Sequence, residues 1–197
     1  MSIDTSLVRS LNTWGEHHRF LVRISSNDLV YAVILLAILW FFNKILKTHP
    51  LKSDWKGFLT TLLTKGLFIF GIPVGIATLI SELISKLYVR QRPFVAVPNV
   101  QLLVPHGADG GMPSHHIVFM VALIVSVYFY QRRLATFLAL LTVLTGIARV
   151  AAGIHYPSDV LVGAVLGAGI AYLYRWGLVK LIDPRKLLLV SATTYNH

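Results

Sequence analysis

The chain has 197 residues, of which 55% are hydrophobic and 13% are charged, and its mean hydropathy is +0.68. Because a soluble domain carries about 25% charged residues, this composition excludes an ordinary soluble domain and indicates an integral membrane protein. In so apolar a chain the net charge of +10 favours membrane topology and contact with anionic lipid headgroups, and no nucleic acid is expected as a partner. The sequence has no cysteine, which excludes disulfides and thiolate chemistry.

The N-terminal segment, residues 1–24, has isolated apolar residues with polar and charged residues between them. These apolar residues are Ile3, Leu7, Leu11, Trp14, Phe20 and Leu21. Because the segment has no continuous apolar core, it does not fit a secretory signal. We expect an amphipathic helix that lies in the membrane interface.

Long apolar runs occupy most of the remaining chain. They are Leu29 to Ile45, Phe58 to Ile84, Ile117 to Tyr130, Leu134 to Val150 and Val160 to Leu181. Spanning a bilayer needs roughly 20 residues, so the third run has to borrow flanking residues. The sequence therefore predicts an all-α, polytopic membrane helix bundle. It would be one domain over residues 1–197, with about five transmembrane helices plus the N-terminal interfacial helix.

The distribution of basic residues predicts the orientation. If successive loops alternate sides, most of the basic residues in the loops share one side of the membrane. They are Lys44, Lys47, Lys52, Lys56, Arg132, Arg133, Arg175, Lys180, Arg185 and Lys186. Excess Lys and Arg mark the cytoplasmic side, so the N-terminus and the connections that carry the polar motifs are expected to face outward. Arg9, Arg19 and Arg23 lie on the outward side and count against this orientation.

Three short polar clusters stand at the ends of apolar runs. They are Arg92-Pro93, Pro113-Ser114-His115-His116, and Arg149 through His155 to Asp159. Ionisable residues near a bilayer indicate a functional site, and the predicted topology brings all three clusters to the outer face. Helix starts there offer free backbone N–H groups, and arginine binds phosphoryl oxygens with two parallel hydrogen bonds. These residue types favour a pocket for a phosphoryl group.

The spacing of His155 and Asp159 suggests covalent catalysis. Residues four apart share a helical face if the helix begins near Tyr156. A carboxylate that accepts from one ring nitrogen leaves the other nitrogen unprotonated and nucleophilic. His116 can then protonate the leaving oxygen and later deprotonate the attacking water. This scheme requires no metal and no other cofactor.

Each of these residues also has a purely structural interpretation when it is taken alone. Pro157-Ser158-Asp159 is typical of a helix start. Arg92 and Arg149 suit anchors at helix ends, and His115-His116 suits a polar helix start or half of a metal site. Their placement together on one predicted face favours the catalytic interpretation.

The three clusters resemble the motifs of the type 2 phosphatidic acid phosphatases, over about residues 82–165. The family pattern is Lys, six residues, Arg-Pro; then Pro-Ser-Gly-His; then Ser-Arg, five residues, His, three residues, Asp. The third motif is the most specific, and Arg149, His155 and Asp159 match its spacing. The resemblance implies that His155 is the nucleophile, Asp159 its orienting carboxylate and His116 the general acid. It also implies that Arg92, Ser114 and Arg149 bind the phosphoryl group.

Three positions depart from the pattern. The family's lysine position falls on Ser85, and Lys86 is one residue closer to Arg92, which rotates it by roughly 100° on a helix. Lys86 is kept as a candidate phosphate-binding residue, with Arg90 as its possible replacement. His115 stands in place of the glycine, so the resemblance carries over only its backbone N–H as a phosphate contact. Ala148 replaces the serine before Arg149.

The connection before the second motif indicates a substrate. Residues Leu102 to Asp109 resemble the corresponding stretch of bacterial undecaprenyl pyrophosphate phosphatases of this family, the BcrC type. The resemblance implies a polyprenyl diphosphate substrate, release of inorganic phosphate, and a location in the bacterial plasma membrane with the site on the extracytoplasmic face. His106 and Asp109 are either contacts for the distal part of a diphosphate or, slightly preferred, part of a solvated loop with an Asp-Gly turn.

Other functions remain open at this point. Within the same class, the substrate can be phosphatidylglycerophosphate, phosphatidic acid or lipid A. A metal-dependent membrane hydrolase would use His115, His116, His155 and Asp159 as ligands. A lipid-binding or transport protein would use the basic pocket to hold a headgroup without chemistry. No oligomeric state is predicted.

Overall fold

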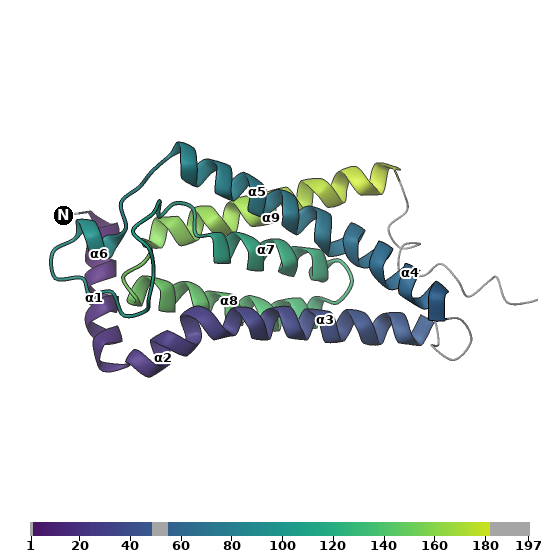
Figure 1. The fold of residues 1–197 in the computed structure, drawn as a ribbon, viewed down its shortest axis with the longest axis horizontal. Coiled ribbons are helices and arrows are strands. Elements are labelled where there is room, and N and C mark those ends of the chain that lie inside the picture. The colour runs from purple at the N-terminus through teal and green to yellow at the C-terminus, as the bar shows by residue number, and fades with distance from the viewer. Residues whose placement is uncertain (1, 49–54, 182–197) are drawn as a thin grey trace, which may run out of the picture.

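The computed structural model describes residues 2–48 and 55–181, which form an elongated bundle of helices (Figure 1). In chain order the elements are α1 Ile3–His17, α2 Arg19–Arg23, η1 Ile24–Asp28, α3 Leu29–Thr48, α4 Trp55–Gly66, η2 Leu67–Gly71, α5 Ile72–Leu87, α6 Pro93–Ala96, α7 His115–Tyr128, α8 Arg132–Ala151 and α9 Pro157–Leu181. The two η elements are single π-helical turns. The described residues contain no strand, so the prediction of an all-α fold is confirmed.

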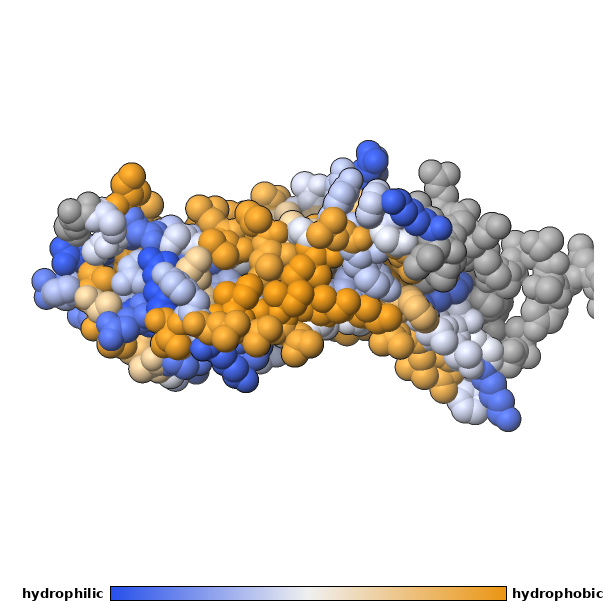
Figure 2. Space-filling model, turned by 90° about the horizontal axis from the view of Figure 1, so that it is seen from above, coloured by the Kyte–Doolittle hydropathy of each residue, from blue (hydrophilic) through white to orange (hydrophobic). Residues whose placement is uncertain are grey.

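Four helical segments within the described residues are long and apolar enough to cross a membrane. They are Arg19–Lys47, Trp55–Leu87, Arg132–Ala151 and Pro157–Leu178. The surface agrees with this, because Figure 2 shows a broad hydrophobic band over the middle of the molecule and hydrophilic residues toward its ends. The predicted multi-pass membrane protein is confirmed, and the helices begin and end within a few residues of the predicted runs.

The third apolar run forms a helix that is shorter than a membrane span. Helix α7 has 14 residues, and it begins at His115, only two residues before the predicted run. It occupies the centre of the bundle, where it packs against α5, α8 and α9 (Figure 1). Eight of its residues are buried. Neighbouring helices therefore surround α7, and its polar N-terminus lies inside the protein near one end of the bundle.

Helix α1 lies across that end of the bundle (Figure 1). Ile3 and Trp14 remain 81% and 46% exposed, as expected for a helix in the membrane interface. The opposite face is fixed to the protein by Asn12, which is fully buried. Its side-chain amide donates to the carbonyl oxygens of Gln101 and Ala151 at 2.9 and 2.8 Å, and its oxygen accepts from the Gln101 N–H at 2.8 Å. Helix α1 is thus a packed part of the fold.

Helices α7 and α9 approach each other closely because α9 has glycine at the contact. A Cβ atom on Gly167 would lie 2.4 Å from the carbonyl oxygen of Val118, and one on Gly163 would lie 3.0 Å from that of Ser114. Small residues four apart permit such contact between membrane helices. The close approach lets the N–H of Ser114 donate to the carbonyl of Asp159 at 3.1 Å, which joins the second and third motifs.

We expect Gly167→Ala to destabilise the protein by about 1–3 kcal/mol, because the added methyl group has to push α7 and α9 apart. The measurement is the thermal unfolding temperature in detergent. Gly169→Ala is the matched control on the same helix, since a Cβ there meets nothing within 4 Å. If both variants unfold at the same temperature, the close packing of α7 on α9 is wrong.

Several of the basic residues used in the orientation argument lie at the other end of the bundle. The end of α3, the start of α4, the α7–α8 turn and the end of α9 all lie there, opposite α1 and α6 (Figure 1). Lys44, Lys56, Arg132 and Arg175 belong to these segments. Of the other residues in the orientation argument, Lys52, Arg185 and Lys186 lie outside the described residues.

Candidate active site

Five chain segments meet at the end of the bundle that α1 covers. They are the segment after α5, the loop before α7, the start of α7, the end of α8 and the start of α9. Five predicted site residues, Arg92, Ser114, Arg149, His155 and Asp159, are each at most 2% exposed. Buried polar side chains need hydrogen-bond partners, so the partners of each residue define the site.

His155 is oriented by a backbone carbonyl. Its Nδ1 lies 2.8 Å from the carbonyl oxygen of Gly111, and because a carbonyl only accepts, Nδ1 carries the proton. The other nitrogen, Nε2, is then unprotonated. The turn that leads to His155 depends on Gly153, whose φ is +77° and where a Cβ would lie 2.6 Å from the carbonyl oxygen of Gln101.

Asp159 lies beside His155 but bonds elsewhere. Its Oδ2 is 3.7 Å from Nδ1 of His155, beyond hydrogen-bond distance. The spacing of the two residues predicted that this carboxylate accepts from the ring. Instead, Oδ2 accepts from the N–H of Tyr156 at 2.8 Å, because Asp159 is the third residue of α9 and reaches back to cap the helix. Its other oxygen, Oδ1, pairs with Arg90 at 2.5 Å.

Arg149 and Ser114 have polar atoms with no partner. Arg149 Nη1 donates to the carbonyl of Ser26 in η1 at 3.1 Å, and its Nη2 lies 3.4 Å from Nε2 of His155. Its Nε and the hydroxyl of Ser114 are buried and have no hydrogen-bond partner within the described structure. Ser114 precedes α7, but its hydroxyl does not cap the helix. An anion that accepted from both groups would supply the missing bonds.

The electrostatic environment keeps His155 neutral. Burial lowers the pKa of His155 well below its ordinary value, and the positive charges of Arg149 and Arg92 lower it further. A neutral imidazole with its proton on Nδ1 has its lone pair on Nε2, which accepts from Nη2 of Arg149 at 3.4 Å. The arrangement is therefore suited to a nucleophile that stays active at physiological pH.

Arg92 is held by the loop before α7. Its Nη1 donates to the carbonyl of Ile154 at 2.9 Å, while Nε and Nη2 donate to Oδ1 of Asp109 at 3.1 and 2.9 Å. Burial raises the pKa of Asp109, but the hydrogen bond and charge of Arg92 outweigh this and lower it. The Asp109 side chain is 74% exposed, as a solvated loop predicts, yet its carboxylate occupies one edge of the guanidinium. The ring centroid of His106, on the same loop, is 6.4 Å from that of His155.

Arg90 connects the site to α1. Its Nη1 donates to Asp159 and to the hydroxyl of Ser158 at 2.7 Å, and its Nη2 pairs with Asp4 at 2.8 Å. Asp4 also accepts from the backbone N–H and the hydroxyl of Ser158. Burial raises the pKa of Asp4, but these hydrogen bonds outweigh it and hold the pKa below its ordinary value. Sequence reasoning missed Asp4, since no spacing pattern links it to residues more than 150 positions away.

The remaining predicted residues lie at or beside the start of α7. His116 is close enough to Arg149 and His155 to interact electrostatically with both. The His115 ring contacts α5, with Nδ1 2.5 Å from the Ser81 hydroxyl and Nε2 3.6 Å from Glu82.

Lys86 lies on the exposed side of α5. It is 71% exposed and pairs with Glu82 at 3.2 Å, and no contact of Lys86 with the cluster around His155 is found in the described structure. No three His, Asp or Glu side chains among residues 2–48 and 55–181 are grouped as metal ligands.

The family model described as the PAP2 superfamily matches residues 66–183, which include all three motifs. The chain belongs to the PAP2 superfamily. This confirms the resemblance that the motifs indicated. In this chain the segment from α5 to α9 supplies the buried residues Arg92, Arg149 and His155, and α1 to α3 pack against it.

Two curated relatives are similar to this PAP2 chain. Undecaprenyl-diphosphatase BcrC of Bacillus subtilis strain 168 is 36% identical over 147 residues, which are 74% of this chain and 66% of the relative. Bacitracin transport permease protein BcrC of Bacillus licheniformis is 29% identical over 113 residues, which are 57% of this chain and 56% of the relative. The matched segments thus span just under two thirds and just over half of these relatives' own lengths.

A solved structure has a similar fold. The transmembrane PAP2 type phosphatidylglycerolphosphate phosphatase from Bacillus subtilis superposes with a TM-score of 0.60 at 19% identity, over 91% of this chain and 86% of that one. The likeness confirms the PAP2 helix bundle.

Proposed function

We propose that this PAP2 protein hydrolyses undecaprenyl diphosphate to undecaprenyl phosphate and inorganic phosphate. The observation that carries the proposal is the pair of buried polar atoms without partners, Nε of Arg149 and the hydroxyl of Ser114. Both belong to residues that the motifs assign to phosphate binding, and Nη2 of Arg149 lies 3.4 Å from the unprotonated nitrogen of His155. The choice of lipid is supported by the Leu102–Asp109 loop and by the relative named an undecaprenyl-diphosphatase.

The reaction begins with in-line attack by Nε2 of His155 on the terminal phosphorus. A bond forms between nitrogen and phosphorus, and the bond from phosphorus to the bridging oxygen breaks. Burial lowers the pKa of His116 to about 3, and the negative charge of the bound diphosphate counters this shift, so that His116 takes up a proton on substrate binding and gives it to the departing undecaprenyl phosphate. His116 then removes a proton from water, which attacks the phosphohistidine and releases inorganic phosphate. Asp159 keeps the start of α9 in place and offsets the positive charge that develops on His155.

The charge on the transferring phosphoryl group is stabilised by Arg92, Arg149, Ser114 and the backbone N–H of His115. The Nε and Nη2 atoms of Arg92 donate to the carboxylate of Asp109 and also to the backbone carbonyls of Asp109 and Gly110, so a phosphoryl oxygen would have to replace the carboxylate beside these carbonyls. Asp109 is exposed and can move into water when the phosphate arrives. These fixed cations supply the neutralisation that divalent metals supply in many phosphoryl-transfer enzymes.

The active site faces the extracytoplasmic side of the bacterial plasma membrane in this proposal. The support is the group of basic residues at the opposite end of the bundle, which the positive-inside rule assigns to the cytoplasm. Arg9, Arg19 and Arg23 lie at the end that carries the site and oppose this orientation. Spent lipid carrier is produced on the outer face, which agrees with a site there.

Phosphate release by the purified protein in detergent with EDTA tests the function. We expect turnover of undecaprenyl diphosphate with a kcat/KM at least tenfold above that for phosphatidic acid, phosphatidylglycerophosphate and lipid A. Preference for one of these lipids would assign a different substrate. Activity that needs an added divalent metal would support the metal-dependent alternative, and binding without turnover would support a headgroup-binding or transport protein.

A further inference from the structure

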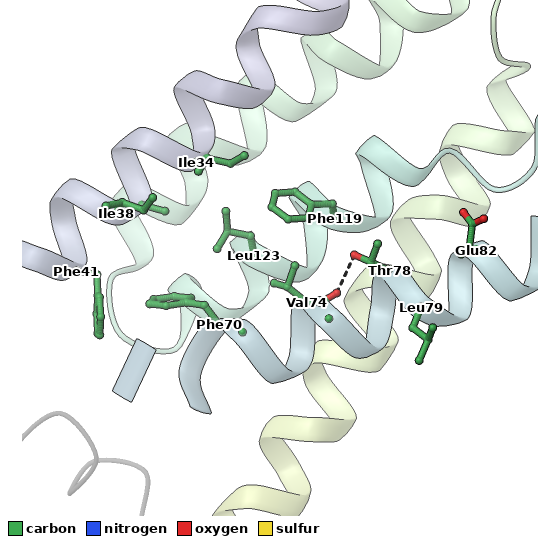
Figure 3. Close-up of a pocket in the computed structure, with 13 residues that line it drawn as sticks. Ile34, Ile38, Phe41, Phe70, Val74, Thr78, Leu79, Glu82, Phe119 and Leu123 are labelled. Carbon is green, nitrogen blue, oxygen red and sulfur yellow. Dashed lines mark hydrogen bonds between the residues drawn. The ribbon is translucent and has the colours of Figure 1, made fainter. Parts of the chain in front are cut away.

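Two acidic side chains lie near the site without a role in the proposed reaction. Glu82 of α5 stands at the end of an apolar groove that α3, α5 and α7 line (Figure 3). It is half exposed and pairs with Lys86 at 3.2 Å, so an exposed cation balances its charge. Asp4 of α1 is 21% exposed and pairs with Arg90, which is itself bound to Asp159. Of the two, Asp4 is joined to a catalytic residue through a single side chain.

Asp4 caps the first turn of α9 from another helix. Because α9 begins at Pro157, its N-cap position falls on Tyr156, which is not one of the short polar residues that accept from the first N–H groups of a helix. Oδ1 of Asp4 instead accepts from the backbone N–H of Ser158 at 3.1 Å, and Oδ2 accepts from the Ser158 hydroxyl. A contact between distant segments of the chain thus fixes the turn that carries Asp159.

Arg90 is held between two carboxylates. Its Nη2 donates to Oδ2 of Asp4 at 2.8 Å, and its Nη1 donates to Oδ1 of Asp159 at 2.5 Å. The guanidinium also lies over the ring of Tyr156, with its central carbon 3.9 Å from the ring centroid. Without the Asp4 carboxylate, the whole guanidinium charge would act on Asp159.

Two carboxylates that share one guanidinium keep a net negative charge beside His155. The ring of His155 is neutral at rest and becomes positively charged when Nε2 bonds to phosphorus. Oδ2 of Asp159 lies 3.7 Å from Nδ1 of this ring, and both side chains are buried, so the carboxylate stabilises the developing charge. A carboxylate neutralised by its own arginine would stabilise the ring less. The charge of Asp4 therefore preserves the effect of Asp159.

We propose that Asp4 is a positioning residue of the active site. It caps α9 and shares Arg90, so that Asp159 keeps its negative charge for the phosphohistidine. The inference rests on the proposed function and adds the N-terminal helix to the residues that determine the rate. The alternative is that Asp4 only stabilises the packing of α1 on α9, and the two roles predict different kinetics.

Asp4→Asn tests the proposal, because asparagine keeps the size of the side chain and can still accept from Ser158. The measurements are kcat and KM for undecaprenyl diphosphate and the thermal unfolding temperature in detergent. We expect kcat to fall about 10- to 100-fold, as for the loss of one charged hydrogen-bond partner. KM is expected to stay close to the wild-type value, because the lost charge acts on the transition state. Asp4→Glu restores the charge and is expected to recover most of the lost kcat.

Two other variants separate the charge of Asp4 from its structural contacts. Ser158→Ala removes the hydroxyl that contacts Asp4 and Arg90 but keeps both carboxylates, so it is expected to lower the unfolding temperature more than kcat. Glu16→Gln makes the same chemical change as Asp4→Asn about 18 Å farther along α1, and it is expected to change neither quantity.

Wild-type kcat in a folded Asp4→Asn protein, or an equal fall of kcat in Ser158→Ala, contradicts the proposal. Asp4→Ser is the second uncharged variant if Asp4→Asn does not fold. Failure of both to fold would assign Asp4 to folding alone and would also contradict the proposal.

A small phosphoryl donor separates failure of this proposal from failure of the function. Phosphoramidate would transfer its phosphoryl group to Nε2 of His155, as its own nitrogen–phosphorus bond breaks and ammonia leaves with the bonding electrons. Phosphorylation of His155 that is slower in Asp4→Asn supports the role of Asp4, even if undecaprenyl diphosphate is not hydrolysed. Equal phosphorylation of both proteins contradicts this role. A wild type with neither phosphorylation nor turnover overturns both proposals.

Discussion

His155→Ala is expected to lower phosphate release from undecaprenyl diphosphate by on the order of 10⁴-fold or more, the scale seen when a catalytic nucleophile is removed. His155 is 1% exposed, its Nδ1 proton is held by Gly111, and its Nε2 lies beside Arg149. Alanine retains none of these features. The measurement is the initial rate of phosphate release in detergent with EDTA, at equal protein concentration and with folding checked by thermal unfolding.

The control for this variant is His17→Ala. His17 is exposed at the end of α1, and its Nδ1 lies 2.9 Å from the carbonyl oxygen of Thr13 in the same helix. It is expected to keep the wild-type rate. Rapid quenching with terminally labelled substrate should trap an acid-labile phosphoenzyme in the wild type and none in His155→Ala. Activity that survives in His155→Ala would exclude the phosphohistidine mechanism.

Arg149→Lys is expected to lower kcat by about 10³-fold, within the range for loss of a group that stabilises transition-state charge. Lysine retains the charge but not the planar set of donors. In Arg149, Nη1 is committed to Ser26 and Nη2 lies beside His155, which leaves Nε for the phosphoryl oxygen. An ammonium group cannot make these three contacts at once. The rate is measured with saturating substrate, so that the effect on kcat is separated from that on KM.

Arg133→Lys is the matched control on the same helix. Arg133 is exposed at the start of α8, at the end of the bundle away from the site, and the change is chemically identical. We expect wild-type kinetics from it. Wild-type kcat in a folded Arg149→Lys protein would contradict the role of the guanidinium, and simple charge attraction would then be enough to explain the motif.

Helix positions were predictable because they depend on neighbouring residues. About 20 consecutive apolar residues are needed to cross a bilayer, and this is a property of a continuous segment. α3, α8 and α9 accordingly match the predicted runs closely. The burial of the short helix α7 was not predictable in the same way, because it depends on the surrounding helices and on glycine contacts such as Gly167.

The sequence by itself determined the fold class, the family and the motif residues, because hydropathy and fixed spacing are local properties. Only the tertiary structure decided the partners of those residues. Spacing paired His155 with Asp159, but α9 begins at Pro157, so His155 lies before the helix and bonds to Gly111. Asp4 and the carbonyl of Ser26 reach the site from distant segments. A contact with a backbone carbonyl leaves no pattern in the amino-acid sequence, and an ion pair between distant segments has no characteristic residue spacing. Tertiary packing therefore decides both kinds of contact.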